Sequence, residues 1–196
     1  MEQGAFILKI LTIACLGSGL GEPGESQYES MREIGRLIAE AGHIVMTGGY
    51  TGIGMEAPAM GATEVGGQAV GVTLLKKPGN GHLSSCIDCS TIGKVSLSLE
   101  QQFGLYLGTL LGADRFVIAS GGGLGTLAEL IAILNLLSKH WQTPKKVVVL
   151  QAGYSGLGWD QGMIHLIAHW CNIPIETFST IYFVQRPEQA ARIAIA

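Results

Sequence analysis

The chain has 196 residues, of which 47% are hydrophobic and only 14% are charged, with a formal net charge of −3. This composition excludes a disordered chain, which would be poor in apolar and rich in charged residues. The lack of a basic block argues against general binding of nucleic acid. The length predicts one domain spanning residues 1–196, and the low charge predicts that part of the surface is buried in a homodimer or larger homo-oligomer.

Glycine is the most over-represented residue, with 29 copies, about twice the usual share of roughly 7%. The glycines cluster in short runs after apolar segments, where they either turn the chain or let the backbone approach a ligand. The four cysteines are too few for a disulfide framework in a chain of this size.

The first half of the chain alternates apolar strands with helices. Residues 10–15 form a continuous apolar run, which is typical of a buried parallel strand. A signal peptide is disfavoured because Lys9 interrupts the run, and no stretch is long enough to span a membrane. A cytoplasmic protein without membrane contact is therefore expected. The next predicted elements are a helix over 28–41, a strand over 43–47, a helix over 55–65 and a strand over 68–74.

The second half repeats this alternation after an irregular region over 76–96 that holds a short strand near 86–91. The predicted elements are then helices over 97–111, 126–137, 158–170 and 187–195, and strands over 115–119, 145–150 and 180–184. Strands alternating with helices predict an α/β fold with a single doubly wound, mostly parallel sheet and helices on both faces, which is Rossmann-like. Ligands of such sheets bind beyond the carboxyl ends of the strands, where three glycine-rich loops lie.

The loop over 120–125 is the strongest candidate for anion binding. Its glycines precede a helix, and the first N–H groups of a helix lack internal partners and carry the positive end of its dipole. Four glycines in five positions exceed what a turn needs, although a tight turn without a ligand is the alternative. The candidate phosphate-binding residues here are Gly122, Gly123, Gly125 and Thr126.

Two further loops are predicted to complete one pocket of nucleotide size, provided that all three converge. One begins with Gly17 and Ser18 after the first strand. The other follows the second strand and opens the next helix; its candidate residues are Gly48, Gly49, Gly52, Gly54 and Met55.

Glu129 lies one turn inside the helix that follows the third loop. A carboxylate here either compensates the helix dipole or acts in a capping box, or it faces the sugar of a bound nucleotide as a catalytic group. Its spacing alone leaves both interpretations open.

Metal sites receive little support from the sequence. Cys86 and Cys89, with His82 upstream, could form part of a zinc or redox site, but no second pair of cysteines completes a structural zinc site. His165 and His169 are one helical turn apart without the glutamate of a metalloprotease motif. No metal and no resident cofactor are expected.

In order and spacing, these motifs resemble the LONELY GUY proteins, a family often filed under a lysine decarboxylase label. The segment over 122–129 looks like the family signature, proline-Gly-Gly-x-Gly-Thr-x-x-Glu, and the resemblance covers roughly residues 11–150. It implies a Rossmann-like, usually dimeric protein that binds nucleoside monophosphates. Characterised members are phosphoribohydrolases, which release the base and ribose 5-phosphate. Lysine decarboxylation is not expected, because no lysine lies in a motif that would hold pyridoxal phosphate.

Two departures from the family pattern affect the functional prediction. Gly121 replaces the proline of the signature, and Tyr106 stands where the family carries an arginine that works with the glutamate; Arg115 is near but on the following strand. One hypothesis is a glycosidase in which Glu129 stabilises positive charge at the anomeric carbon or activates water. The other is a non-catalytic nucleotide or molybdenum-cofactor carrier, which the missing arginine favours.

Overall fold

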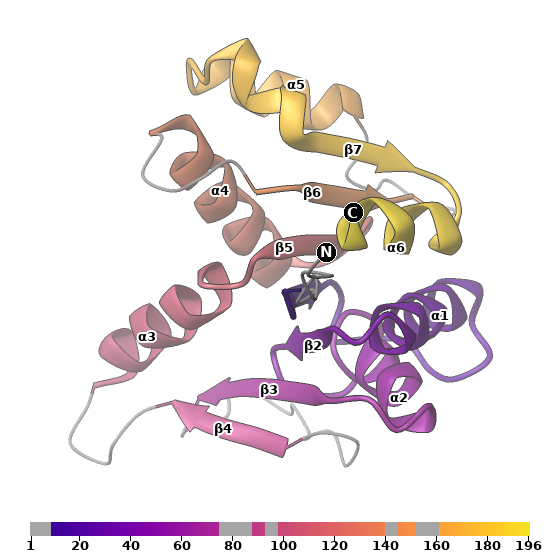
Figure 1. Ribbon diagram of the computed structural model, residues 1–196. Helices are drawn as coiled ribbons and strands as arrows, with labels where there is room; N and C mark the ends of the chain where they lie inside the picture. Colours follow the sequence, from indigo (N-terminus) through magenta and orange to yellow (C-terminus); the bar gives the residue numbers. More distant parts are fainter. Residues whose placement is uncertain (1–8, 75–87, 93–97, 140–144, 152–160) are drawn as a thin grey trace, which may run out of the picture.

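The computed structural model describes residues 9–74, 88–92, 98–139, 145–151 and 161–196. Within these residues, seven strands form one sheet that lies between two layers of helices (Figure 1). Every described strand pair is parallel. The predicted doubly wound α/β fold is therefore confirmed.

The element bounds follow the apolar runs of the sequence. In the first half they are β1 (Thr12–Leu16), α1 (Ser26–Glu40), β2 (Ile44–Thr47), α2 (Glu56–Glu64), β3 (Ala69–Leu74) and β4 (Asp88–Ile92). In the second half they are α3 (Leu99–Leu111), β5 (Arg115–Ala119), α4 (Leu124–Ser138), β6 (Val147–Leu150), α5 (Gln161–Trp170), the 3-10 helix η1 (Ile175–Thr180), β7 (Ile181–Val184) and α6 (Pro187–Ile195). The sequence did not indicate η1, and parts of the strand and helix expected over 86–91 and 158–170 lie outside the described residues.

The strand order indicates where along the sheet a ligand is expected to bind. The order is β4-β3-β2-β1-β5-β6-β7, so the chain moves outward from β1 and then returns to β5 on its other side. Leu16 and Ile118 are partners near the carboxyl ends of these two central strands. The direction of winding reverses between them, and in open α/β sheets this switch point is where ligands bind.

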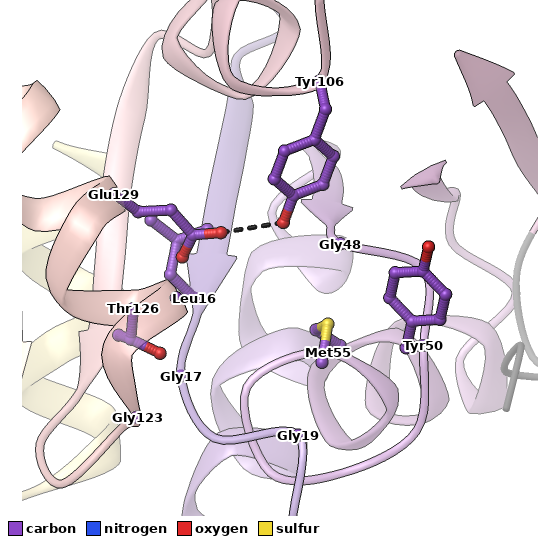
Figure 2. A pocket seen from close by; sticks show the side chains of 11 residues that line it. Leu16, Gly17, Gly19, Gly48, Tyr50, Met55, Tyr106, Gly123, Thr126 and Glu129 are labelled. Atoms are coloured by element: carbon purple, nitrogen blue, oxygen red, sulfur yellow. Dashed lines mark hydrogen bonds between the residues drawn. The ribbon is translucent and has the colours of Figure 1, made fainter. Parts of the chain in front are cut away.

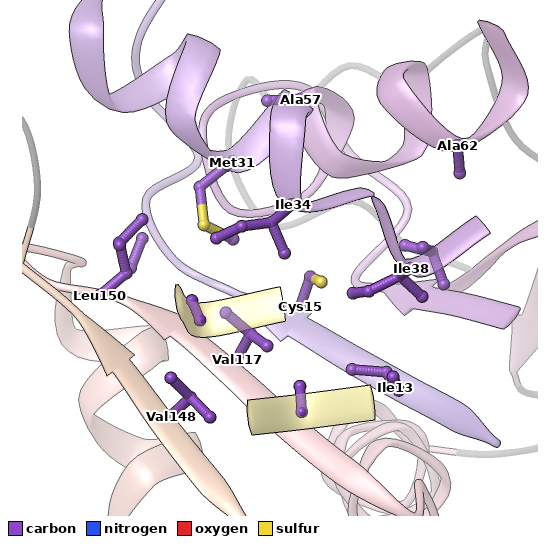
Figure 3. Packing of buried hydrophobic residues seen from close by; sticks show 14 of the residues in the cluster. Ile13, Cys15, Met31, Ile34, Ile38, Ala57, Ala62, Val117, Val148 and Leu150 are labelled. Carbon is purple, nitrogen blue, oxygen red and sulfur yellow. The ribbon is translucent and has the colours of Figure 1, made fainter. Parts of the chain in front are cut away.

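Each face of the sheet buries its own apolar core. Helices α1, α2 and α6 cover one face, where Ile13, Cys15 and Val117 pack against Met31 and Ile34 (Figure 3). Ile13 and Cys15 occupy alternate positions of β1, because successive side chains of a strand point to opposite faces. Burial raises the pKa of the Cys15 thiol to about 12, so this cysteine remains protonated inside the core.

The other face is covered by α3, α4 and α5. Here Ala14, Leu16, Phe116 and Ile118 pack against α4 residues such as Leu130. Both faces of β1 and β5 are thus apolar, which explains why their sequences read as uninterrupted hydrophobic runs.

Apolar side chains also lie on the solvent side of this second helix layer. Leu99, Phe103 and Leu105 on α3 and Ile131 on α4 are between 44% and 50% exposed. This exposure fits the predicted homo-oligomer, which stays a prediction. No helix in the described part of the chain is long and apolar enough to cross a membrane.

Two glycines allow α1 and α2 to pack closely. A Cβ atom added to Gly35 would overlap the Pro58 carbonyl group, and one added to Gly61 would overlap the Arg32 carbonyl oxygen. The obstacle in both cases is backbone, which cannot move aside as a flexible side chain can. This contact fixes α2, and hence the loop before it, against the rest of the domain.

We expect Gly61→Ala to lower the free energy of unfolding by roughly 1–3 kcal/mol, the usual cost of overpacking a close contact. The measurement is chemical denaturation followed by circular dichroism. Gly108→Ala on α3 is the matched control, because an added Cβ there meets no atom within 4 Å and alanine favours helix. Equal stabilities for the two variants would contradict this account of the α1–α2 contact.

Candidate functional site

The loops that follow β1 and β2 touch through their backbones. A Cβ at Gly54 would overlap the Gly17 nitrogen, and one at Gly52 would overlap Gly19. The N–H of Gly54 donates to the Ser18 carbonyl oxygen at 2.9 Å. These glycines are therefore needed for contact between the two loops.

The amino end of α2 is already satisfied by its own loop. The carbonyl oxygen of Gly52 accepts from the N–H groups of Glu56 at 3.0 Å and Ala57 at 3.2 Å. Gly52 adopts a φ of +104°, which favours glycine. The N–H groups of this helix end are thus committed within the protein, unlike those expected of a phosphate-binding loop.

The amino end of α4 differs from that of α2. Its N-cap is Gly123, and no described side chain caps the helix. Cβ atoms added to Gly123 and Gly125 would meet no atom within 4 Å, so both residues border open space. This loop therefore combines helix N–H groups that lack a side-chain cap with room for a ligand.

Gly121 makes this loop incompatible with the proline of the LONELY GUY signature. Its φ is +87°, whereas the proline ring fixes φ near −65°. Proline therefore cannot adopt the backbone conformation that this loop has at position 121.

The three loops converge on a cavity of about 200 Å³, here called the glycine pocket (Figure 2). It lies beyond the carboxyl ends of β1, β2 and β5, as the fold predicts. The candidate residues that line it are Gly17, Gly48, Met55, Gly123, Gly125, Thr126 and Glu129. The remaining candidates, Ser18, Gly49, Gly52, Gly54 and Gly122, are not among its lining residues.

Several of the candidates outside the lining support the loops. The Ser18 hydroxyl oxygen accepts from the Leu20 N–H at 3.0 Å, and the Gly49 N–H donates to the Thr47 hydroxyl at 3.1 Å. A Cβ at Gly122 would overlap the Thr126 side chain. These residues hold backbone conformation, a role that glycine content alone cannot distinguish from ligand binding.

Glu129 and Tyr106 meet inside the glycine pocket. Helix α4 presents the Glu129 carboxyl group, α3 presents the Tyr106 ring, and the tyrosine hydroxyl donates to Glu129 Oε1 at 2.7 Å (Figure 2). The Glu129 residue is only 9% exposed. The position at which the related family carries arginine is therefore occupied by a neutral hydrogen-bond donor.

Burial shifts the acidity of both groups. It raises the pKa of Glu129 to about 7, an effect that the hydrogen bond from Tyr106 partly opposes. Burial, and then the charge of Glu129, raise the pKa of Tyr106 above its usual value. Near neutral pH the phenol keeps its proton and the carboxyl group is protonated in a large fraction of molecules.

No lysine, arginine or histidine is among the described residues that line this pocket. Arg115 does not supply the missing charge, because it begins β5 at the amino edge of the sheet. There its guanidinium donates to the Asp114 carbonyl oxygen at 2.9 Å. The one ionisable carboxyl group in the pocket thus faces no described cation.

Some lining residues were not named as candidates from the sequence, although Gly19 and Tyr50 belong to the predicted loops. Leu16, Gly19 and Tyr50 line the pocket beside Tyr106, which the sequence marked only as the place of a missing arginine. Of the histidines at 165 and 169, His165 packs its ring edge-on against Phe178, with the ring centroids 4.9 Å apart. His82 and Cys86 lie outside the described residues.

Fold and site together define a Rossmann-like α/β protein whose glycine-rich loops converge at the sheet's switch point. The chain belongs to the SLOG cluster4 family, whose model matches residues 10–167. This family is related to proteins with LONELY GUY-like Rossmann folds, so the resemblance is confirmed at this broader level. A protein of Archaeoglobus fulgidus without a characterised activity is 31% identical over 144 residues, which cover 74% of this chain and 86% of that protein.

Solved structures share the fold over nearly the whole chain. The molybdenum cofactor binding protein from Rippkaea orientalis superimposes with a TM-score of 0.64 and 21% identity, covering 95% of this chain and 96% of that one. The molybdenum cofactor carrier protein from Chlamydomonas reinhardtii gives a TM-score of 0.63 and 22% identity, covering 94% and 95%. At such identities the similarity shows a common fold.

We expect Glu129→Gln to stabilise the protein more at pH 8 than at pH 5. The folded protein holds a proton on Glu129 that the unfolded chain releases, so wild-type stability falls as pH rises from 4.5, the ordinary pKa of the side chain, through about 7. Glutamine removes this penalty, and the gain should grow by roughly 2–3 kcal/mol between the two pH values. Urea denaturation at each pH measures it.

Tyr106→Phe serves as the companion variant. It removes the hydrogen bond that lowers the Glu129 pKa, so the pH-dependent loss of stability should extend to higher pH than in the wild type. A difference between Glu129→Gln and wild type that is the same at both pH values would rule out a raised pKa.

Proposed function

We propose that this protein binds and carries a phosphorylated small molecule, a nucleotide or the molybdenum cofactor, and does not hydrolyse it. The observation that carries this proposal is the hydrogen bond from Tyr106 to Glu129, which replaces the expected cation–carboxylate pair with a pair that is neutral when Glu129 is protonated. The proposal has two parts, the binding of a phosphate group and the absence of glycosidase chemistry.

The binding part rests on the amino end of α4. Uncapped helix N–H groups and the positive end of the dipole favour an anion, and Gly123 and Gly125 leave space beside them. Thr126, buried in the same first turn, lines the pocket and has a hydroxyl group that can donate to a phosphate oxygen. A phosphate here would be held by backbone dipoles and a hydroxyl group.

The second part follows from protonation. Cleavage of an N-glycosidic bond develops positive charge at the anomeric carbon, which an ionised carboxylate stabilises, and the leaving base needs a proton donor. A Glu129 carboxyl group that retains its proton provides weak charge stabilisation, and the raised pKa of Tyr106 makes its phenol a poor acid. A protonated carboxyl group with a pKa of about 7 is suited to protonating a leaving base. However, no second carboxyl group is among the described residues that line the glycine pocket, so none stabilises the developing positive charge or activates water.

The molybdenum cofactor is included because of ligand chemistry and fold. Its organic part, like a nucleoside monophosphate, contains both a phosphate ester and a nitrogen heterocycle, joined in the nucleotide through ribose, so one phosphate site suits both. The neighbours named for binding or carrying this cofactor share the fold over 94% or more of this chain. In this proposal the cofactor is cargo.

Gly123→Val should weaken binding of ribose 5-phosphate by about tenfold or more, equivalent to about 1.4 kcal/mol. The added side chain would enter the space beside the helix N–H groups without clashing, since nothing lies within 4 Å of the new Cβ. Isothermal titration measures the affinity, and Gly108→Ala is the control that should bind as the wild type does. Unchanged affinity in a folded Gly123→Val protein would place the phosphate elsewhere.

Incubation of the wild-type protein with AMP or GMP should show binding without release of free base above a protein-free blank. Chromatography of the mixture measures the base. In parallel, protein isolated from cells that make the molybdenum cofactor should contain more molybdenum per chain than Gly123→Val from the same cells. Robust turnover that Glu129→Gln abolishes would overturn the carrier proposal in favour of a phosphoribohydrolase.

A further inference from the structure

A second cavity of about 500 Å³ adjoins the glycine pocket between α3 and the loop after β2. Four residues line both spaces: Tyr50, Tyr106, Gly125 and Glu129. The second cavity, here called the aromatic cavity, adds Leu99, Glu100 and Phe103 from the first turns of α3. Because the two cavities share walls, a ligand whose phosphate lies at α4 has room to extend toward α3.

Aromatic side chains form much of the wall of this cavity. The rings of Phe103 and Tyr106 lie nearly parallel, with an interplanar angle of 25° and centroids 6.0 Å apart. Phe103 is 44% exposed and Leu99 is 49% exposed, so apolar surface faces open space. A flat ring placed against these side chains would cover that surface and stack on the aromatic faces.

The polar groups around the cavity restrict the kind of ring. Glu129 lies at the junction with the glycine pocket and Glu100 lies at the start of α3, while no described lining residue is a lysine, arginine or histidine. Glu100 is exposed and ionised at neutral pH, and the Ser98 hydroxyl, which donates to it at 2.6 Å, lowers its pKa further. Carboxyl oxygens accept hydrogen bonds from N–H groups, so a ring that bears amino groups suits this cavity better than an anionic ring.

We infer that the aromatic cavity binds the amino-bearing flat heterocycle of a phosphorylated ligand, and that Phe103 determines affinity for that ring. This inference rests on the proposed function, because the phosphate of the same ligand would lie at the amino end of α4. It assigns the heterocycle of the ligand to the aromatic cavity, and it adds that this ring bears amino groups.

The test compares GMP with ribose 5-phosphate by isothermal titration under one set of conditions. The two probes share the sugar and the phosphate, so their difference measures the ring. Wild-type protein should bind GMP about tenfold more tightly, within the range expected for stacking of one base on aromatic side chains. Phe103→Ala should remove this advantage while leaving ribose 5-phosphate affinity within about twofold of wild type.

Two further variants separate ring contact from damage to α3. Phe103→Tyr keeps an aromatic face and should retain the preference for GMP. Leu105→Ala changes a residue that is 50% exposed on the same helix and lines neither cavity, so it should bind both probes as wild type does.

The possible results distinguish failure of the ring site from failure of the proposed phosphate site. If ribose 5-phosphate binds and GMP binds no more tightly, the ring site is wrong while the phosphate site stands. If Phe103→Ala weakens both probes equally, Phe103 acts on the fold and the inference fails. If neither probe binds, the proposed function fails and the ring site fails with it.

Discussion

The backbone contact between the loops after β1 and β2 determines how the rest of the site is arranged. Glycine at positions 17, 52 and 54 lets the two loops touch, and the contact commits the N–H groups of the second loop and of α2 to oxygens of the protein. The first N–H groups of α4, by contrast, have no side-chain cap and lie beside the open space at Gly123 and Gly125. Three similar glycine-rich segments thus have different roles, two in building the pocket and one in presenting donors to it.

Tyr106 gives Glu129 a neutral hydrogen-bond donor, where a protein with arginine at this position would place a charge. A guanidinium beside a buried carboxylate would lower its pKa and keep it ionised. A phenol compensates less of the desolvation cost, so the pKa of Glu129 stays near 7. With a phenol at this position, the site holds a carboxyl group that is often protonated near neutral pH.

The sequence was sufficient to predict the sheet because β1, β2, β5 and β6 are short apolar runs followed by glycine or by helical periodicity. It also located the edge at which the loops meet. It did not separate Gly54, which is needed for packing, from Gly123, which borders the pocket, because that difference depends on which loop lies opposite. Nor does the apolar pattern of the helix predicted over 97–111 reveal that Phe103 faces a cavity.

The lack of cations among the described lining residues bears on how cargo would be gained and lost. Backbone dipoles act at contact distance, whereas attraction between separated charges is screened over about 10 Å at 0.1 M salt. A net charge of −3 provides no long-range attraction for an anionic ligand. The affinity for an anionic ligand should therefore vary little with ionic strength. Its association should proceed at ordinary diffusional rates, so different anions would differ mainly in how slowly they dissociate.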